Sequence, residues 1–321
     1  MERVVEPAAK ASPWRRNSET IAFGVLVAAI VLGPFFIYPL FLMQALCFAL
    51  FACAFNLLIG YVGLLSFGHA LYFGWASYIS AHAAKVWGLP PELAILSGTA
   101  VAALFGLVAG SLAIRRQGIY FAMITLALAQ MMYFVAVRMK FTGGEDGIQA
   151  VPRGTLFGLF DLRNETTMYM LVAIIFLAGM LLIYRIIHSP FGEVLKAIRE
   201  NETRAISLGY KTDRYKLMAF VLSATLAGVA GSTKAILLQI ASLTDVNWPM
   251  SGEVVLMTLV GGLGTIFGPI VGSFVILLMQ YKLAFVGEWV LVIQGVIFVA
   301  CVLLFRRGIV GELAYKLHLR L

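Results

Sequence analysis

Asn56, Ser66 and His69 are the polar residues of an otherwise apolar stretch, 56–74, which also holds four glycines. Amide, hydroxyl and imidazole groups can contact a polar solute, and non-helical backbone at membrane depth persists only where protein covers it or water reaches it. The cluster therefore predicts the lining of a solute pathway. The alternative is that Ser66 and His69 only form hydrogen bonds between packed helices, which for any single residue explains the pattern equally well.

Further polar groups lie within or near apolar stretches. They are Gln130, Lys234, Gln239, Glu253, Gln280, Glu288 and Gln294. Ionisable groups inside a membrane are candidates for function by default. Lys234, Glu253 and Glu288 could instead reach the outer interface, and we favour this second interpretation.

The composition decides the class of protein. Apolar residues make up 61% of the 321 residues, charged residues make up only 12%, and the mean hydropathy is +0.92. An ordinary soluble domain has about 25% charged residues, so a water-facing globule is excluded. We expect an all-α polytopic membrane protein with about 8–10 transmembrane helices, each of about 20 residues. Cys47, Cys53 and Cys301 lie in apolar stretches without metal-ligand spacing, which predicts core residues and no metal site.

Apolar runs predict where the helices cross the membrane. The runs cover residues 21–38, 40–59, 64–84, 93–114, 119–137, 168–187, 217–240 and 289–305. The first run is longer than the core of a signal peptide, so it is interpreted as a retained helix. The chain then divides into a cytoplasmic N-terminal segment (1–20), a single transmembrane domain (21–305) and a cytoplasmic C-terminal tail (306–321).

The distribution of positive charge predicts the orientation, because Lys and Arg accumulate in short cytoplasmic loops. With the N-terminus inside, 17 Lys and Arg residues fall on the cytoplasmic side and 6 fall outside, with Lys234 in or near a span. Both termini are therefore expected in the cytoplasm. The net charge of +8 is attributed to this asymmetry and to contact with anionic lipid, not to nucleic acid.

The last third of the chain contains a break. A cytoplasmic C-terminus requires four passes after the basic loop, and two of them must fit into residues 253–282. Gly261, Gly262 and Gly264, followed by Gly268-Pro269, interrupt this interval. We therefore expect a broken or re-entrant Gly-rich element in place of two complete spans.

The longest cytoplasmic loop, about 188–216, contains an amphipathic stretch at 189–209. Its apolar residues recur at three- and four-residue spacing, which predicts one surface helix that ends at Gly209. The mixed charges on the other face favour a docking helix for a soluble partner. The alternative is an ordinary amphipathic helix at the lipid interface.

Several chemistries lack their motifs in this sequence. Gly-Lys occurs nowhere, so there is no phosphate-binding Gly-x-x-x-x-Gly-Lys-[Ser/Thr] loop and the chain is not expected to be its own ATPase. Gly-x-Ser-x-Gly and His-Glu-x-x-His are also absent, which gives no support to a serine or zinc hydrolase.

Five motifs occur in order along the chain: NLLIGYVGLLSFGH (56–69), RQGIYFAMITL (116–126), TGGEDG (142–147), RENETRAISLG (199–209) and GGLGTIFGP (261–269). Together they closely resemble the LivM-type permease of bacterial branched-chain amino-acid ABC importers. The resemblance runs from about residue 40 to 311. One departure is Arg306, which stands where the family often has proline.

The resemblance implies partners. They are a LivH-like second permease, two ABC ATPase subunits that bind ATP-Mg, a periplasmic substrate-binding protein and membrane lipid. No cofactor is expected on this chain itself. Residues 199–209 match the family's cytoplasmic coupling segment, which implies contacts with an ATPase through Glu200, Asn201, Glu202, Arg204 and Gly209.

We therefore expect an inner-membrane permease subunit that moves branched-chain amino acids, or a related small amino acid, amide or organic acid, into the cytoplasm. The pathway candidates are Asn56, Ser66, His69, Thr125 and Gln130, beside the helix break at Gly261, Gly262 and Gly264. A self-sufficient secondary transporter of a small polar solute is the alternative, since two Gly-rich breaks resemble the broken helices of such proteins. An intramembrane enzyme is a weaker one, because no nucleophile and base occur at a recognisable spacing.

Overall fold

The computed structural model describes residues 13–283, 285, 287, 289–304 and 308–316. Parts of the predicted N-terminal segment (1–12) and tail (306–307, 317–321), together with Glu288 and the departure at Arg306, lie outside the described residues. The helices are α1 (Pro13–Phe36), α2 (Pro39–Tyr61), α3 (His69–Lys85), α4 (Pro91–Ala113), α5 (Ile119–Arg138), α6 (Glu165–Ile187), α7 (Pro190–Glu200), α8 (Glu202–Ser207), α9 (Thr212–Leu238), α10 (Trp248–Gly261), α11 (Gly268–Leu283), α12 (Trp289–Leu304) and α13 (Gly308–Lys316).

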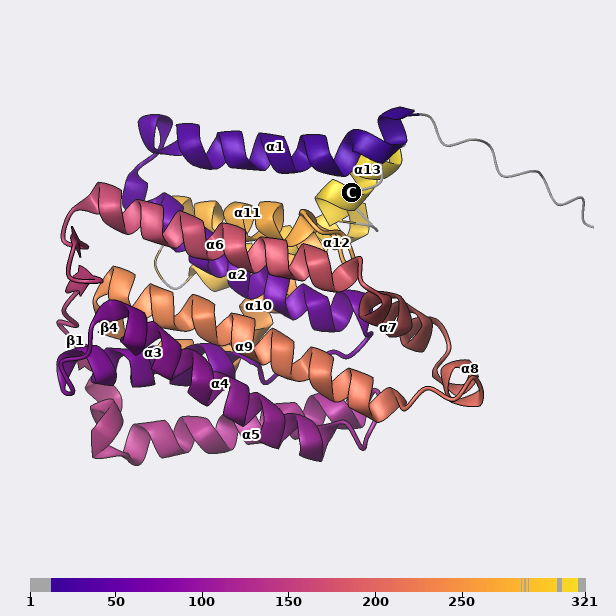
Figure 1. Ribbon diagram of the computed structural model, residues 1–321, viewed down its shortest axis with the longest axis horizontal. Coiled ribbons are helices and arrows are strands. Elements are labelled where there is room, and N and C mark those ends of the chain that lie inside the picture. Colours follow the sequence, from indigo (N-terminus) through magenta and orange to yellow (C-terminus); the bar gives the residue numbers. More distant parts are fainter. Residues whose placement is uncertain (1–12, 284, 286, 288, 305–307, 317–321) are drawn as a thin grey trace, which may run out of the picture.

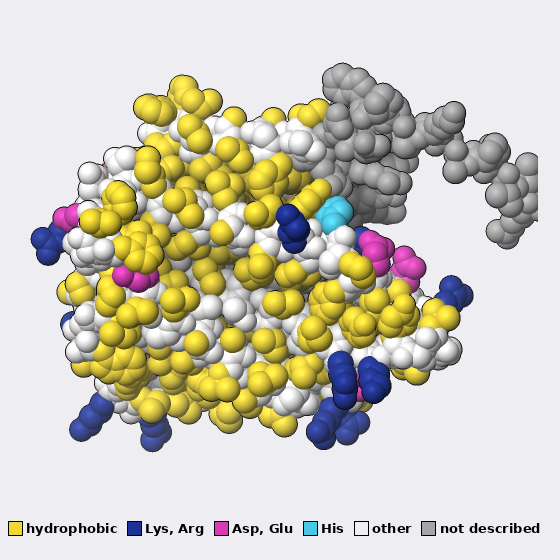
Figure 2. All heavy atoms as spheres, viewed as in Figure 1, with side chains coloured by type: hydrophobic (Ala, Val, Ile, Leu, Met, Phe, Trp, Pro, Cys, Tyr) yellow, Lys and Arg dark blue, Asp and Glu magenta, His cyan; other side chains and the backbone are white. Residues whose placement is uncertain are grey.

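These helices confirm the predicted all-α membrane fold. Among the described residues, five are long and apolar enough to cross a membrane: α2, α4, α5, α6 and α9. Shorter apolar helices cover Thr20–Phe36, Gly268–Leu283 and Val292–Cys301. On the face shown in Figure 2, apolar side chains form a broad middle band and most charged side chains gather toward the two ends, as a lipid-facing surface requires.

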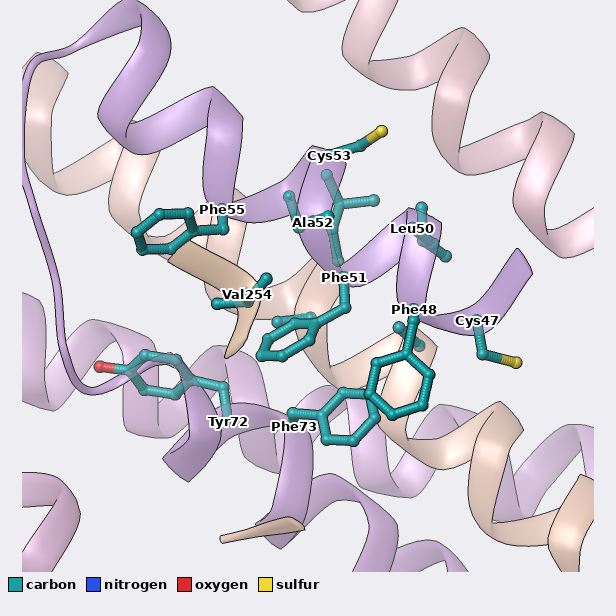
Figure 3. Close-up of a cluster of buried hydrophobic side chains, with 14 of the residues drawn as sticks. Cys47, Phe48, Leu50, Phe51, Ala52, Cys53, Phe55, Tyr72, Phe73 and Val254 are labelled. Atoms are coloured by element: carbon teal, nitrogen blue, oxygen red, sulfur yellow. The ribbon is translucent and has the colours of Figure 1, made fainter. Parts of the chain in front are cut away.

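Helix α2 forms the centre of the core. It is apolar on all sides and nearly every residue from Leu42 to Tyr61 is buried, because α6, α9, α10 and α11 pack around it. Figure 3 shows Phe51 of α2 against Phe73 of α3, with their ring centroids 4.5 Å apart in a stacked arrangement. The predicted core positions of Cys47 and Cys53 are confirmed, since both thiols are buried and free.

Close packing of α3, α4 and α9 depends on small residues. A Cβ placed on Gly231 of α9 would lie 2.0 Å from the carbonyl oxygen of Phe73, and one on Gly228 would lie 2.3 Å from the Cβ of Ala102. From α4, a Cβ on Gly106 would lie 2.6 Å from that of Ala224. Glycine therefore lets these three backbones approach without a side chain between them.

Two segments of irregular backbone enter the bundle. The first, residues 62–68, follows α2, so α3 begins at His69 and the prediction of a helix start at residue 64 is wrong. His69, which follows this segment, contacts Ser223 of α9. Ser223 is about 16 Å along α9 from the first residue of that helix, at ~1.5 Å per residue, so the segment reaches into the interior of the bundle. The second segment, residues 262–267, separates α10 from α11 and is called the glycine loop below; the predicted Gly-rich break is thereby confirmed.

Short strands lie at one end of the bundle and the connecting helices at the other (Figure 1). Strands β1 (Ile148–Gln149) and β4 (Ile240–Ala241) pair antiparallel, as do β2 (Thr155–Leu156) and β3 (Phe160–Asp161). Helices α7 and α8 lie at the opposite end, where α1 begins and α13 lies. The two ends are therefore built differently.

Replacing Gly231 with Ala should lower the stability of the protein. The added methyl group would meet the backbone of Phe73, which cannot rotate away, so we expect a loss of about 1–3 kcal/mol. Thermal unfolding of the detergent-purified protein measures it. Gly24→Ala in α1 is the control, since nothing lies within 4 Å of a Cβ there. Equal effects of both variants would contradict the packing argument.

Candidate functional site

Asn56 joins α2 to the glycine loop. Its Nδ2 donates to the carbonyl oxygen of Thr265 at 2.8 Å, and its Oδ1 accepts from the amide of Gly264 at 3.0 Å. Both amide functions of one side chain are used on one loop. Asn56 is 3% exposed, so these bonds replace water for two otherwise unpaired backbone groups.

The glycine loop also stabilises itself. The Thr265 hydroxyl donates to the carbonyl oxygen of Gly262 at 2.8 Å and accepts from the amide of Gly268 at 3.1 Å. Gly262 and Gly264 adopt φ values of 129° and 75°, which residues with a side chain rarely adopt. Glycine is therefore required at these two positions by the backbone conformation itself.

His69 lies in a packed interior. It is fully buried, and the rings of Phe55, Tyr72 and Phe220 meet it edge to face at centroid distances of 5.0, 5.6 and 6.1 Å. Its Nε2 lies 2.9 Å from the hydroxyl of Ser223. Since that hydroxyl donates to the carbonyl oxygen of Ala54, it accepts from Nε2–H. These two hydrogen bonds link α3 to α9 and α9 to α2.

Thr125 joins segment 62–68 to α5, and Ser66 caps the segment's own backbone. The hydroxyl of Thr125 donates to Ala122 at 2.9 Å and accepts from the amide of Phe67 at 3.2 Å, while the hydroxyl of Ser66 accepts from the amide of Gly68. A cavity of about 450 Å³ lies beside this contact. Apolar side chains and two glycines line it: Gly63, Leu64, Leu65, Phe67, Gly118, Ile119, Phe121, Ala122, Met123 and Leu126.

The pathway candidates therefore fall into separate places. Ser66 and Thr125 lie together beside the cavity, Asn56 lies on the glycine loop, and His69 lies in the aromatic interior. Gln130 lies further along α5 and is half-buried. Their role in a pathway stays a prediction.

The amphipathic stretch is two helices, and the prediction of one is wrong. Asn201 takes up an extended conformation (φ −159°, ψ 98°) after α7, and its Oδ1 accepts from the amide of Arg204 at the start of α8. An asparagine in this position ends one helix and caps the next. The end of the second helix near Gly209 is as predicted, with φ of 89° at that glycine. Residues 189–209, which hold α7, α8 and the predicted coupling residues, are together called the coupling segment below, although the coupling role itself stays a prediction.

Glu202 holds α8 against the bundle. It pairs with Lys216 of α9, and it accepts from Thr212 at 3.1 Å and from Gln117 Nε2, in the connection between α4 and α5, at 2.9 Å. Lys216 is only 3% exposed. Of the predicted coupling residues, Glu200, Asn201, Arg204 and Gly209 are exposed, whereas Glu202 is engaged internally.

Arg199 is a residue that the sequence analysis did not single out. Its guanidinium donates to the carbonyl oxygen of Gly60, in the last turn of α2. No pattern in the sequence connects these positions, because the acceptor is a backbone atom 139 residues away. The contact joins the coupling segment to the end of the central helix.

Lys234 and Asp245 form a buried ion pair, so the interpretation that Lys234 reaches the outer interface is wrong. Their side chains are 7% and 1% exposed, and the ammonium also lies 5.8 Å from the centre of the Phe73 ring. Asp245 follows β4 and was not singled out from the sequence. Within the described chain, no three His, Cys, Asp or Glu side chains are grouped to hold a metal ion.

Comparisons with known proteins agree on one family. Residues 37–302 match the family described as branched-chain amino acid transport system / permease component. The chain is similar to the high-affinity branched-chain amino acid transport system permease protein LivM of Escherichia coli (26% identical) and of Salmonella typhimurium (25%), in each case over 75% of this chain and 62% of the relative. It therefore spans about 62% of the length of these relatives. A probable branched-chain amino acid transport permease protein LivH of Methanocaldococcus jannaschii is 29% identical, over 48% of this chain and 51% of the length of that relative. No solved structure matches.

Replacing Lys234 with Met should destabilise the protein, because it leaves the Asp245 carboxylate buried without its partner. Removing one member of a buried pair typically costs about 3–5 kcal/mol, whereas replacing both with apolar residues is often neutral. Thermal unfolding in detergent should therefore show a large loss for Lys234→Met and recovery in Lys234→Met/Asp245→Leu. Lys85→Met is the control, since Lys85 donates to Gln149 at an exposed site. A double variant as unstable as the single one would refute the argument.

Proposed function

The chain belongs to the permease component family of branched-chain amino acid transport systems, and from this premise we propose that it is the membrane-spanning subunit of an ABC importer. It moves branched-chain amino acids, or a related small amino acid, amide or organic acid, into the cytoplasm. Separate ATPase subunits that bind ATP-Mg drive the movement. The chain itself supplies the helices, the pathway wall and the surface on which an ATPase acts.

The observation that carries this proposal is the coupling segment. It lies at one end of the bundle, its exposed residues Glu200 and Arg204 carry opposite charges, and its other contacts run inward. Glu202 ties it to α9 and Arg199 ties it to α2. Such a segment can receive a push from a soluble partner and pass it to the membrane helices, which an isolated lipid-facing helix would not do.

The proposal includes an orientation and a set of partners. We place α7, α8 and both termini in the cytoplasm and the paired strands on the outside, in a bacterial inner membrane. A LivH-like permease completes the pathway, and two ATPases and a periplasmic binding protein complete the importer. Helices α4 and α5 expose large apolar side chains, among them Leu104, Met123 and Phe134, which suit contact with the second permease or with lipid. Nucleic acid is not a partner.

The cavity beside Thr125 supports a small, partly apolar substrate. Its lining is almost entirely apolar side chains and glycine backbone, and Thr125 lies behind it, bonded to the lining residues Phe67 and Ala122. A branched aliphatic side chain would be desolvated there favourably. Leucine, isoleucine and valine are therefore the first substrates to test.

A self-sufficient secondary transporter is the second candidate, and one observation favours it. Such proteins use ionisable residues buried in the membrane to couple transport to an ion gradient. The buried pair of Lys234 and Asp245 is of this kind. Since the pair also ties α9 to the segment that leads into α10, a purely structural role explains it without ion coupling.

The two candidates differ in what accompanies the chain. Tagging it, extracting it from its native membrane in mild detergent and identifying stoichiometric partners separates them. We expect a second permease and ATPases that contain a phosphate-binding loop. A chain that purifies alone and transports on a proton or sodium gradient without ATP would refute the importer and establish the secondary transporter.

Changing charges on α8 should abolish uptake while membrane insertion stays intact. Glu202→Lys places a cation against buried Lys216, and Arg204→Glu reverses an exposed charge that suits an ATPase surface. Uptake of labelled substrate and the amount of protein in the membrane are measured together. Arg163→Glu, at the opposite end of the bundle, is the control. Normal uptake in both α8 variants would reject the coupling role.

Substrate class is tested in a strain that lacks this gene. We expect uptake of labelled leucine, isoleucine and valine to fall at least tenfold and to return with the wild-type chain. Urea, short amides and aromatic acids are the comparison panel. Unchanged uptake of all three branched-chain amino acids would reject them as substrates and point to the member of the panel whose uptake is lost.

A further inference from the structure

We propose that Arg199 is a positioning residue that transmits movement of the coupling segment to the glycine loop through the end of α2. The inference rests on the proposed function and names how this chain would link ATP hydrolysis to a change in the membrane helices. It follows from one juxtaposition: α7, the last turn of α2 and the break between α10 and α11 meet at a single point. The residues at this point are Asn56, Gly60, Arg199, Gly262 and Gly264.

The bond from Arg199 meets a need of the helix end. Gly60 lies in the last turn of α2, where carbonyl groups have no partner within the helix and carry the negative end of the helix dipole. A guanidinium satisfies both conditions, since it donates a hydrogen bond and brings a positive charge. The stem of Arg199 also passes close to Gly63, where a Cβ would lie 3.2 Å from its Cγ.

The next contact links the end of α2 to the glycine loop. Asn56 is four residues before Gly60 and so lies on the same face of α2, one turn away. Its two hydrogen bonds hold the backbone of Gly264 and Thr265. Gly60 itself lies against the loop, since a Cβ there would come within 2.9 Å of the Gly264 amide nitrogen. The end of α2 and the glycine loop are therefore one packed unit.

The guanidinium bonds to one part of this unit and lies close to the other. Besides its bond to Gly60, its terminal nitrogen lies 3.3 Å from the position that a Cβ on Gly264 would occupy. Helix α13 packs on the loop from another direction, where a Cβ on Gly308 would come within 2.4 Å of the Cα of Gly262. A displacement of α7 that keeps the bond therefore pulls on the end of α2 and on the loop packed against it.

The helix that carries Arg199 is suited to this role. Leu195 and Ile198 are buried, and α7 contacts α2, α6 and α9, so it moves as a packed element. Lys196, on the same helix, pairs only with Glu193 three residues earlier and has no contact with the loop among the described interactions. Two cations on one helix thus have different surroundings, which provides a matched control.

The experiment uses the whole importer in proteoliposomes, with uptake and ATP hydrolysis measured in the same sample. Arg199→Met removes the donor and keeps much of the stem that packs on Gly63. Loss of a charge-assisted hydrogen bond shifts a two-state equilibrium by about tenfold or more, so we expect uptake per ATP hydrolysed to fall by about tenfold. The complex should still assemble and hydrolyse ATP.

Two further variants serve as controls. Arg199→Lys, which restores one charged donor, should recover part of the ratio of uptake to ATP hydrolysis, and Lys196→Met should leave this ratio at the wild-type value.

Three results decide the matter. A wild-type ratio of uptake to hydrolysis in Arg199→Met would overturn the inference, because movement then reaches the loop without the bond. A parallel fall of assembly, hydrolysis and uptake in both Arg199→Met and Arg199→Lys would also overturn it, since it identifies a structural role only. A wild-type complex without ATP-dependent uptake would instead refute the proposed function, so the two failures are distinguishable.

Discussion

The structure depends on one constraint: a backbone that leaves helical geometry inside an apolar bundle must find its hydrogen bonds within the protein. Two segments do so, residues 62–68 and the glycine loop, and in both the partners are side chains from distant helices. Asn56 serves the glycine loop, and Thr125 serves the amide of Phe67. The polar residues that stand out in the apolar sequence are therefore first of all the partners of broken backbone, and any contact with a solute is built on that arrangement.

The same constraint explains how far the sequence predicts the fold. Long apolar runs predicted the helices because a backbone that crosses a membrane must satisfy its own hydrogen bonds, as a helix does. Closely spaced glycines predicted the break between α10 and α11. The start of α3 at His69 was missed because residues 64–67 are as apolar as a helix, and only their bonds to α5 and neighbouring backbone show that they are not one. The coupling segment kept a helical period across Asn201, whose capping bond to Arg204 divides it in two.

The site was less predictable for a related reason. Composition marks Lys234 as unusual, but only the fold shows that Asp245, which follows β4, is its partner in the interior. Arg199 lies inside a recognisable motif, yet its acceptor is the carbonyl oxygen of Gly60, a group that every residue has. Side-chain pairs at helical spacing can be read from a sequence, whereas a bond to a distant backbone atom leaves no signature there. Residues of this second kind are the ones that join the coupling segment to the bundle.

The contacts are distributed unevenly between the two ends, and this bears on how the helices can move. At the end with the strands, the Lys234–Asp245 pair and the β1–β4 pairing tie the segment after α9 to the bundle through a buried charge and backbone bonds. At the other end, Glu202 pairs with the buried Lys216, but the glycine loop is held by neutral bonds from Asn56. The end of α2 beside the loop is held by Arg199, whose side chain is otherwise exposed. A buried ion pair is costly to separate, whereas an exposed arginine can exchange its bond with water. The bonds that hold the glycine loop and the end of α2 are therefore easier to exchange than either ion pair.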